Sequence, residues 1–273
     1  MLGCASRGRA AGDEASTAVA SSGRKLRRIG LELYTVRREL AQDLPGTLKR
    51  VAEIGYKEVE FAGYANRTPT EIRDLLQVNG LTAPSTHIGL PAIQREPQKT
   101  FDDAKTIGHE WVTVASLSGR QTTVDDWKRV ADSFNQAGRA ARTAGLRFSY
   151  HNHNTEFRPI KDSAVKPYDI LLAETDPSVV DFQMDLYWVV NAGASPLDYI
   201  ARYPGRFTML HVKDSMGPPD HKMADVGAGM IDFRTIFARA GASVKHYFVE
   251  HDDPPDPFAS AAASYRYLAT LEF

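Results

Sequence analysis

The sequence predicts an α/β fold, a single (β/α)8 or TIM barrel, and two observations carry that prediction. From Ile29 onward, a short β-branched or aromatic run, a polar loop, an amphipathic stretch and a glycine recur eight times. The runs begin roughly 26 to 39 residues apart, and connections of this length are typical of parallel strands with right-handed crossovers. Eight such units form a barrel of about 250 residues, which matches the span 29–273.

Eight segments have the composition of buried strands. Each is short, rich in β-branched and aromatic residues, and bounded by turn residues. In chain order the predicted strands are Ile29–Tyr34, Lys57–Phe61, Ala83–His87, Trp111–Ala115, Leu146–His151, Val179–Asp185, Phe207–Val212 and His246–Glu250.

Helix start and stop signals lie between these strands. Thr68 and Glu71 form a capping box around Pro69, and Gly80 follows the helix that they begin. The other predicted helices follow the same pattern. Their N-caps are Asp43, Thr123, Ser195, Asp232 and Asp256, and Gly55, Gly108, Gly145 and Gly241 stand where the chain leaves a helix.

A doubly wound open sheet is the alternative architecture. It is disfavoured because no GxGxxG turn, which such a sheet uses to bind a pyrophosphate, follows the first predicted strand. Gly227-Ala228-Gly229 is a GxG, but it follows a loop. We therefore interpret it as a tight turn before the helix that begins at Asp232, and not as a phosphate cradle.

Composition and charge limit the partners. The 273 residues are 42% hydrophobic and carry a net charge of −1, so the chain lacks the basic field of a nucleic-acid-binding protein. A small or neutral polar molecule fits better as a partner. Cys4 is the only cysteine, so a metal site would rest on histidine, aspartate and glutamate. The sequence does not fix the oligomer, and a homo-oligomer stays open.

Residues 1–28 differ from the barrel domain predicted over residues 29–273. They carry a net charge of +4, leave −5 for the rest, and lack helical or strand periodicity, which predicts a disordered, targeting-like extension. Leu2-Gly3-Cys4 resembles the end of a bacterial lipoprotein signal, which would mean export and a lipid anchor at Cys4. A chance match in a cytoplasmic protein is the alternative. No apolar run reaches the about 18 residues of a transmembrane helix.

Ionisable residues stand at the carboxyl ends of the last four predicted strands, where barrels hold their chemistry. Strand alternation points His151, Asp185, His211 and Glu250 toward the barrel axis. This mixed nitrogen and oxygen set suits one divalent ion, Mn²⁺, Zn²⁺, Co²⁺ or Fe²⁺, rather than calcium. The alternative is a hydrogen-bonded structural histidine and a helix-capping aspartate, but four buried unpaired groups would each cost several kcal/mol.

Several motifs together resemble a known family, the xylose-isomerase-like TIM barrels described as sugar phosphate isomerases/epimerases. That family also includes ketose 3-epimerases, inosose and dehydroshikimate dehydratases, and apurinic endonucleases. The resemblance extends over residues 29–273. The motifs are Leu33-Tyr34-Thr35-Val36-Arg37, Gly55-Tyr56-Lys57-Glu58-Val59-Glu60, residues 150–157 (YHNHNTEF), Met184-Asp185-Leu186-Tyr187-Trp188, Leu210-His211-Val212-Lys213-Asp214 and residues 226–233 (VGAGMIDF).

The resemblance implies a metal site of Glu, Asp, His and Glu from strands five to eight. Asp185, His211 and Glu250 match it, whereas His151 stands where the family has its first glutamate. Trp188 stands where epimerases and dehydratases carry a substrate-binding histidine, and it is predicted to form a stacking wall for a sugar.

The resemblance also implies proton carriers and substrate contacts. His153 matches a catalytic histidine of the dehydratases and is the first choice for general acid/base. Orienting His151 is its alternative role, and which of these two histidines is the strand-five ligand stays open. The further predicted catalytic residues are Glu250, Lys213 and Glu156, and the predicted substrate contacts are Tyr34, Glu60, His87, Trp188 and Lys213.

The resemblance implies proton abstraction beside a carbonyl, with a metal-stabilised enediolate. The leading hypothesis is a divalent-metal-dependent sugar isomerase or epimerase. A lyase or dehydratase acting on a 3-keto-sugar, glycoside or cyclitol is the runner-up, and the departures at His151 and Trp188 favour it. A non-catalytic sugar-binding barrel is the alternative of another class. A nuclease is disfavoured by the net charge of −5 over residues 29–273.

Overall fold

The computed structural model describes residues 23–273 and shows a closed barrel of eight parallel strands in the order β1-β10-β7-β6-β5-β4-β3-β2. The predicted fold class is confirmed, and all eight strands lie where the sequence places them. The predicted lipid anchor at Cys4 lies outside the described residues. The barrel strands are β1 Gly30–Glu32, β2 Glu58–Phe61, β3 Thr82–His87, β4 Trp111–Val114, β5 Arg147–His151, β6 Val180–Asp185, β7 Phe207–Val212 and β10 His246–Val249.

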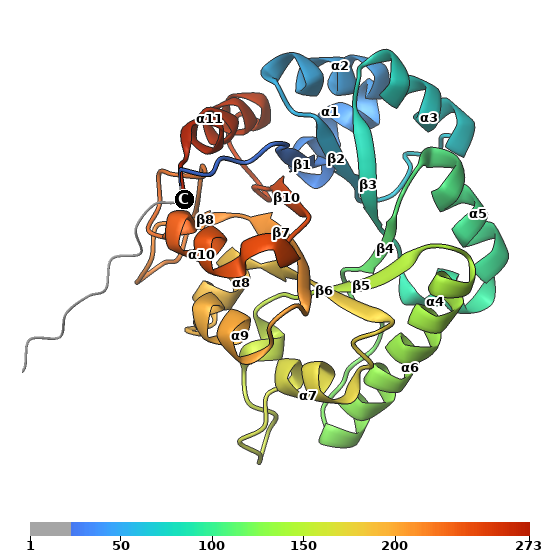
Figure 1. Cartoon of the computed structure of the whole chain (residues 1–273), viewed down its shortest axis with the longest axis vertical. Coiled ribbons are helices and arrows are strands. Elements are labelled where there is room, and N and C mark those ends of the chain that lie inside the picture. Colours follow the sequence, from blue (N-terminus) through green and yellow to red (C-terminus); the bar gives the residue numbers. More distant parts are fainter. Residues whose placement is uncertain (1–22) are drawn as a thin grey trace, which may run out of the picture.

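Helices surround the ring of strands (Figure 1). The closed order places the first strand, β1, between β2 and the last strand, β10, so no barrel edge is left unpaired. The helices are α1 Arg37–Gln42, α2 Leu44–Ile54, α3 Pro69–Val78, α4 Leu90–Arg95, α5 Pro97–Ile107, α6 Val124–Thr143, α7 Pro167–Glu174, α8 Leu186–Asn191, α9 Pro196–Arg202, α10 Phe233–Ala240 and α11 Pro257–Thr270.

The predicted capping residues begin the helices that they were expected to begin. The Thr68 hydroxyl accepts from the backbone N–H of Glu71, and the Glu71 carboxylate accepts from the Thr68 N–H, which completes the capping box. Thr123 and Asp126 form a second box at α6. Since each cap satisfies backbone donors that the helix leaves unpaired, these short polar signals fix where each strand–helix unit turns. The side chains of Asp43, Ser195, Asp232 and Asp256 cap the other helices predicted to start there.

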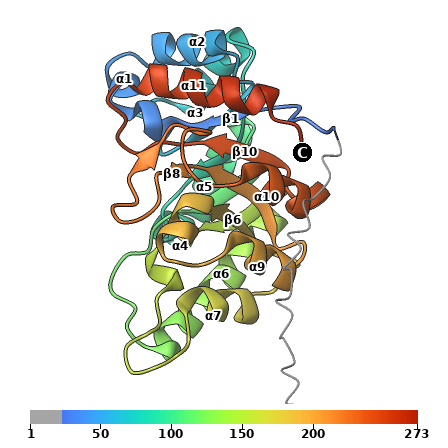
Figure 2. The same ribbon diagram turned by 90° about the vertical axis from the view of Figure 1, so that its left-hand side faces the viewer.

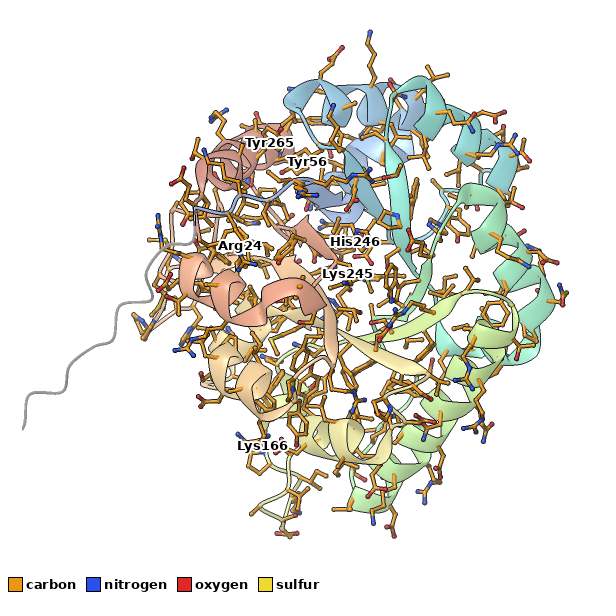
Figure 3. All side chains as sticks on the ribbon, in the orientation of Figure 1. Arg24, Tyr56, Lys166, Lys245, His246 and Tyr265 are labelled. Carbon is orange, nitrogen blue, oxygen red and sulfur yellow. The ribbon has the colours of Figure 1, made fainter. Side chains whose placement is uncertain are left out.

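Side chains project into the interior of the strand ring (Figure 3). Trp111, at the start of β4, forms a small apolar cluster with Met209 of β7 and Phe248 of β10. Beside it, His246 Nδ1 lies 2.8 Å from Glu58 Oε2. These residues form a floor inside the barrel, and ligands of such barrels bind at the opposite end, at the carboxyl ends of the strands.

A two-stranded hairpin that the sequence did not predict, β8 Asp214–Ser215 and β9 Met223–Ala224, follows β7. In side view it lies at the end of the barrel opposite the C-terminus (Figure 2). The buried Asp214 carboxylate accepts backbone N–H bonds from Gly227 and Gly229, at 2.9 Å each, and from Ser215 and Ile231. A Cβ on Gly229 would lie 2.3 Å from Asp214 Oδ1. The GxG turn is therefore folded around an internal carboxylate, as its interpretation as a tight turn requires.

Replacing Asp214 with asparagine is expected to destabilise the protein by about 2–3 kcal/mol. An amide nitrogen would face two of the four backbone donors, and buried donors that lose a charged acceptor cost energy on this scale. Urea unfolding followed by circular dichroism measures the change. Asp232→Asn is the matched control, because asparagine also caps helices well. Equal unfolding midpoints for the two variants would contradict the structural role of Asp214.

Candidate metal centre and its cavity

The four predicted metal ligands meet at the carboxyl ends of neighbouring strands. His151 ends β5, Asp185 ends β6, His211 is on β7, and Glu250 directly follows β10. Asp185 and His211 are paired in register across β6 and β7, and strand alternation turns both side chains inward. All four residues are buried. Adjacent strands therefore bring together residues that are far apart in the sequence.

Distances within this set are short. His211 Nδ1 lies 2.6 Å from Glu250 Oε2, and His151 Nε2 lies 3.7 Å from Asp185 Oδ2. One ligand atom from each of Asp185, His211 and Glu250 falls within 4.8 Å of the others. The structure thus gathers three of the predicted ligands around one point, with His151 at their side.

Glu60, on β2, fixes which nitrogen each imidazole presents. Its carboxylate lies 2.5 Å from His211 Nε2 and accepts from Gln183 Nε2 at 2.8 Å. A carboxylate at this site accepts, so His211 must donate from Nε2 and Gln183 must turn its amide nitrogen toward Glu60. The Gln183 Oε1 then faces His151 Nδ1 and His87 Nε2, at 3.0 Å each. The lone pair of His151 Nε2 is thereby directed to the predicted ligand set. His211 Nδ1 lies 2.6 Å from Glu250 Oε2 and donates to that carboxylate, so a metal bound at His211 would take the place of the Nδ1 proton.

Charges around the site set the protonation states of the two imidazoles differently. Burial opposes the charge of His211, but Glu60 and Glu250 outweigh it and raise the pKa of His211 to about 9. Burial also opposes the charge of Glu250, yet Lys213 and His211 hold its pKa well below the usual range. Burial, followed by the nearby His211, lowers the pKa of His151 well below its ordinary value. His151 is therefore a neutral imidazole, the form that binds metals.

The residues present fit a divalent metal. Asp185 Oδ2 is buried, has no hydrogen bond of good geometry within residues 23–273, and lies 3.1 Å from the Lys213 ammonium, so it already faces a positive charge. His211 donates its other nitrogen to a carboxylate, which is the usual outer support of a metal-bound histidine. Carboxyl groups also outnumber cations among the buried residues here. The acids are Glu32, Glu60, Asp185, Glu250 and the partly buried Asp252, and the cations are Lys213 and His211. Two imidazole nitrogens and two carboxylates are a donor set for a transition metal.

A cavity of about 400 Å³ opens over this set. Of the predicted catalytic and substrate-contacting residues, Tyr34, His87, His153, Lys213 and Glu250 line it. The His151 and His153 rings lie 5.0 Å apart, centroid to centroid, so His153 stands next to the ligand set while facing the cavity. One wall is polar and the other is made of small or apolar residues. That second wall consists of Ala62, Ile88, Gly89, Ala115 and Ser116.

Three predicted residues lie elsewhere. Glu60, expected to contact substrate, is fully buried beneath the rim, because its oxygens are held by His211 and Gln183. Glu156, expected to be a catalytic base, accepts hydrogen bonds from the Tyr150 hydroxyl, the His153 N–H and the Thr155 hydroxyl. It shapes the loop after β5 and does not line the cavity.

Trp188, expected to form a wall for the sugar, instead packs behind the cavity. Its ring centroid lies 5.7 Å from that of His153 and 5.7 Å from Lys213 Nζ. The Asp185 carboxylate caps the helix that carries it, accepting from the Trp188 N–H at 3.0 Å. This short helix turns the ring toward two cavity residues and away from the cavity itself.

Two residues of the site, Gln183 and Asp252, were not predicted from the sequence. Gln183 precedes Asp185 by two positions on β6, and Asp252 follows Glu250 by two. Strand parity was a usable signal for Gln183, which shares the inward face of Asp185. Glu32, on β1, is also buried, and burial together with Glu60 and Glu250 raises its pKa well above the usual range.

Among residues 23–273, no helix has both the length and the apolar character needed to cross a membrane.

Comparisons with known proteins agree with this architecture. An inosose dehydratase from Geobacillus kaustophilus is 24% identical over 230 residues, which cover 72% of this chain and 72% of the relative. A crystal structure of a sugar phosphate isomerase/epimerase from Parabacteroides distasonis has a TM-score of 0.79 and 28% identity, covering 93% of this chain and 98% of that chain. A structure of the IOLI protein with a bound zinc atom has a TM-score of 0.69 and 14% identity, covering 88% of this chain and 95% of that chain.

The family model described as the xylose isomerase-like TIM barrel matches residues 48–269, most of the chain. The match includes β2 to β10, and with them all four predicted metal ligands. The resemblance drawn from the motifs is therefore confirmed: this chain belongs to the xylose isomerase-like TIM-barrel family.

Proposed function

We propose that this chain is a divalent-metal-dependent lyase that eliminates water or an alcohol from a keto-sugar, keto-glycoside or keto-cyclitol. One observation carries the choice of elimination. His151 stands where epimerases of this family carry a proton-shuttling glutamate, its Nδ1 lies 3.0 Å from Gln183 Oε1, and its Nε2 lone pair is directed to the proposed metal site. His151 is therefore unavailable as a second base. Elimination requires one proton carrier at the reacting carbon, and His153 lies in the cavity to serve as that carrier.

His151, Asp185, His211 and Glu250 would hold the metal. When bound, the metal would supply positive charge that stabilises the negative charge developing on the carbonyl oxygen of the substrate. His153 takes the proton from the carbon next to the carbonyl, and the electron pair of that C–H bond forms the new double bond as the C–O bond to the leaving group breaks. The His153 imidazolium then returns its proton to the departing oxygen, so that water or an alcohol leaves.

The similar proteins support elimination, and one of them also supports a second candidate reaction. A relative named inosose dehydratase matches most of the chain, and dehydration is an elimination of this kind. Isomerisation or epimerisation is the second candidate, favoured by the similar structure named sugar phosphate isomerase/epimerase. It would need a proton carrier on the opposite face of the substrate. His87 is the imidazole available there, since it lines the cavity and has one nitrogen engaged by Gln183.

Elimination is expected when the Mn²⁺-loaded enzyme is mixed in deuterated water with inososes, 3-keto-glycosides and free ketoses. NMR would show an enone product with release of water or aglycone. His153→Asn should reduce the rate at least about 100-fold, because a positioned acid/base contributes 10²–10⁴-fold. His221→Asn, a matched change in the β8–β9 loop, should retain the rate. Deuterium in recovered substrate or its epimer without elimination would identify an isomerase, and neither exchange nor product across the panel would favour a binding barrel.

Replacing Glu60 with glutamine is expected to weaken Co²⁺ binding by about 10- to 100-fold, the usual effect of removing an outer carboxylate from a metal-bound histidine. Glutamine can present a donor to His211 Nε2 and so disturb both the ring and the Gln183 amide. Isothermal titration with Co²⁺ measures the affinity. Glu58→Gln is the matched control, since it makes the same change two residues earlier on β2, where the partner is His246. Equal losses of affinity in both variants would refute the specific role of Glu60.

A further inference from the structure

Lys213 places a buried ammonium among three carboxylates. It lies two residues after His211, on the same inward face of the chain, and its side chain is 2% exposed. Its Nζ lies 3.1 Å from Asp185 Oδ2, 2.9 Å from Glu250 Oε2 and 2.8 Å from Asp252 Oδ1. Asp185 and Glu250 are also two of the four predicted metal ligands. One cationic side chain thus contacts the carboxylates on which a metal would depend.

The oxygens that face Lys213 are the oxygens best placed to bind a cation. Metal–carboxylate bonds are about 2.0–2.2 Å long, so an oxygen shared between a metal and Nζ would hold the two positive centres within about 5 Å of each other. Like charges repel strongly at such a separation inside a protein. The Lys213 ammonium and a divalent metal therefore cannot both make their best contacts with Asp185 and Glu250.

We propose that Lys213 is an internal counter-ion that competes with the divalent metal for Asp185 and Glu250, and so sets the metal affinity of the site. The inference rests on the proposed metal-dependent function. Asp252 gives the ammonium a carboxylate that a metal does not need, because it is outside the predicted ligand set and lies 2.8 Å from Nζ. The Trp188 ring, whose centroid lies 5.7 Å from Nζ, offers the ammonium a further favourable contact. The ammonium therefore keeps partners when the other two carboxylates turn to a metal.

Such a counter-ion has a second consequence. Asp185 and Glu250 are buried with ligand oxygens within 4.8 Å of each other, and carboxylates packed this closely would repel one another without a cation among them. Lys213 compensates part of that charge without a metal. The barrel can then fold before metal is acquired, and the metal-binding energy is reduced by the contacts that Lys213 gives up.

Co²⁺ titration of chelator-treated full-length protein tests the proposal. Lys213→Met keeps a long side chain but removes the charge, and it should bind Co²⁺ at least about tenfold more tightly than wild type. Lys213→Arg, the matched control, keeps the charge and should bind no more tightly than wild type. Without metal, Lys213→Met should melt at a lower temperature than wild type, and Co²⁺ should raise its melting temperature by a larger increment. Lys213→Gln is the substitute, with the same expectations, should the methionine variant not fold.

The outcomes separate this inference from the proposed function. Wild type that binds Co²⁺, together with charge-removing variants that bind equally or more weakly, overturns the competition and leaves the metal site intact. A flat titration for wild type, the Lys213 variants and Asp185→Asn alike overturns both. Binding only after the charge at position 213 is removed supports the inference in its strongest form.

Discussion

The arrangement of the site depends on one buried carboxylate, Glu60. It is fully enclosed, and the His211 Nε2 and the Gln183 amide donate to it. His87 Nε2 lies 3.5 Å from it, and the Glu32 carboxyl group is a further neighbour. Because the Gln183 amide nitrogen points to Glu60, its carbonyl oxygen points to His151 and His87. Glu60 therefore also determines which nitrogen of these two imidazoles donates. Imidazoles from three strands therefore present defined nitrogens without any contact from a loop. Burying such groups unpaired would cost several kcal/mol each, so this network has to form together with the barrel itself.

Residues at different levels along the barrel axis have different roles, structural at the lower levels and chemical at the carboxyl ends of the strands. On β2, Glu58 bonds His246 at the floor, and Glu60 supports the rim. Above them, the predicted ligands stand on the ends of β5, β6 and β7 and directly after β10. Rigid strands hold these groups to within small displacements, whereas the loops add residues that face the cavity, among them His153 and Asp252. The same fold can thus keep a metal-binding rim while its surrounding loops change the substrate.

Sequence patterns predicted what depends on local chemistry. Capping signals such as Thr68 with Glu71 located the helices, and strand parity pointed His151, Asp185, His211 and Glu250 inward. Strand parity shows whether a side chain points inward, but not how deep in the barrel it lies. Glu60 was therefore expected to line the cavity, although it lies beneath the cavity. The packing of Trp188 behind His153 depends on a helix that turns directly after β6. The contacts of Gln183 and Lys213 join strands more than 25 residues apart, and no local pattern encodes them.

Asp214 bears on how the rim is formed. Its carboxylate holds four backbone N–H groups of the β8–β9 hairpin and the following turn. In other proteins, converging amides of this kind receive an anion from solution or from a ligand. Here the chain supplies its own anion, so the conformational entropy of this loop is lost during folding and not when a ligand arrives. This part of the rim is thus ordered in advance, and its shape is independent of the charge that a ligand carries.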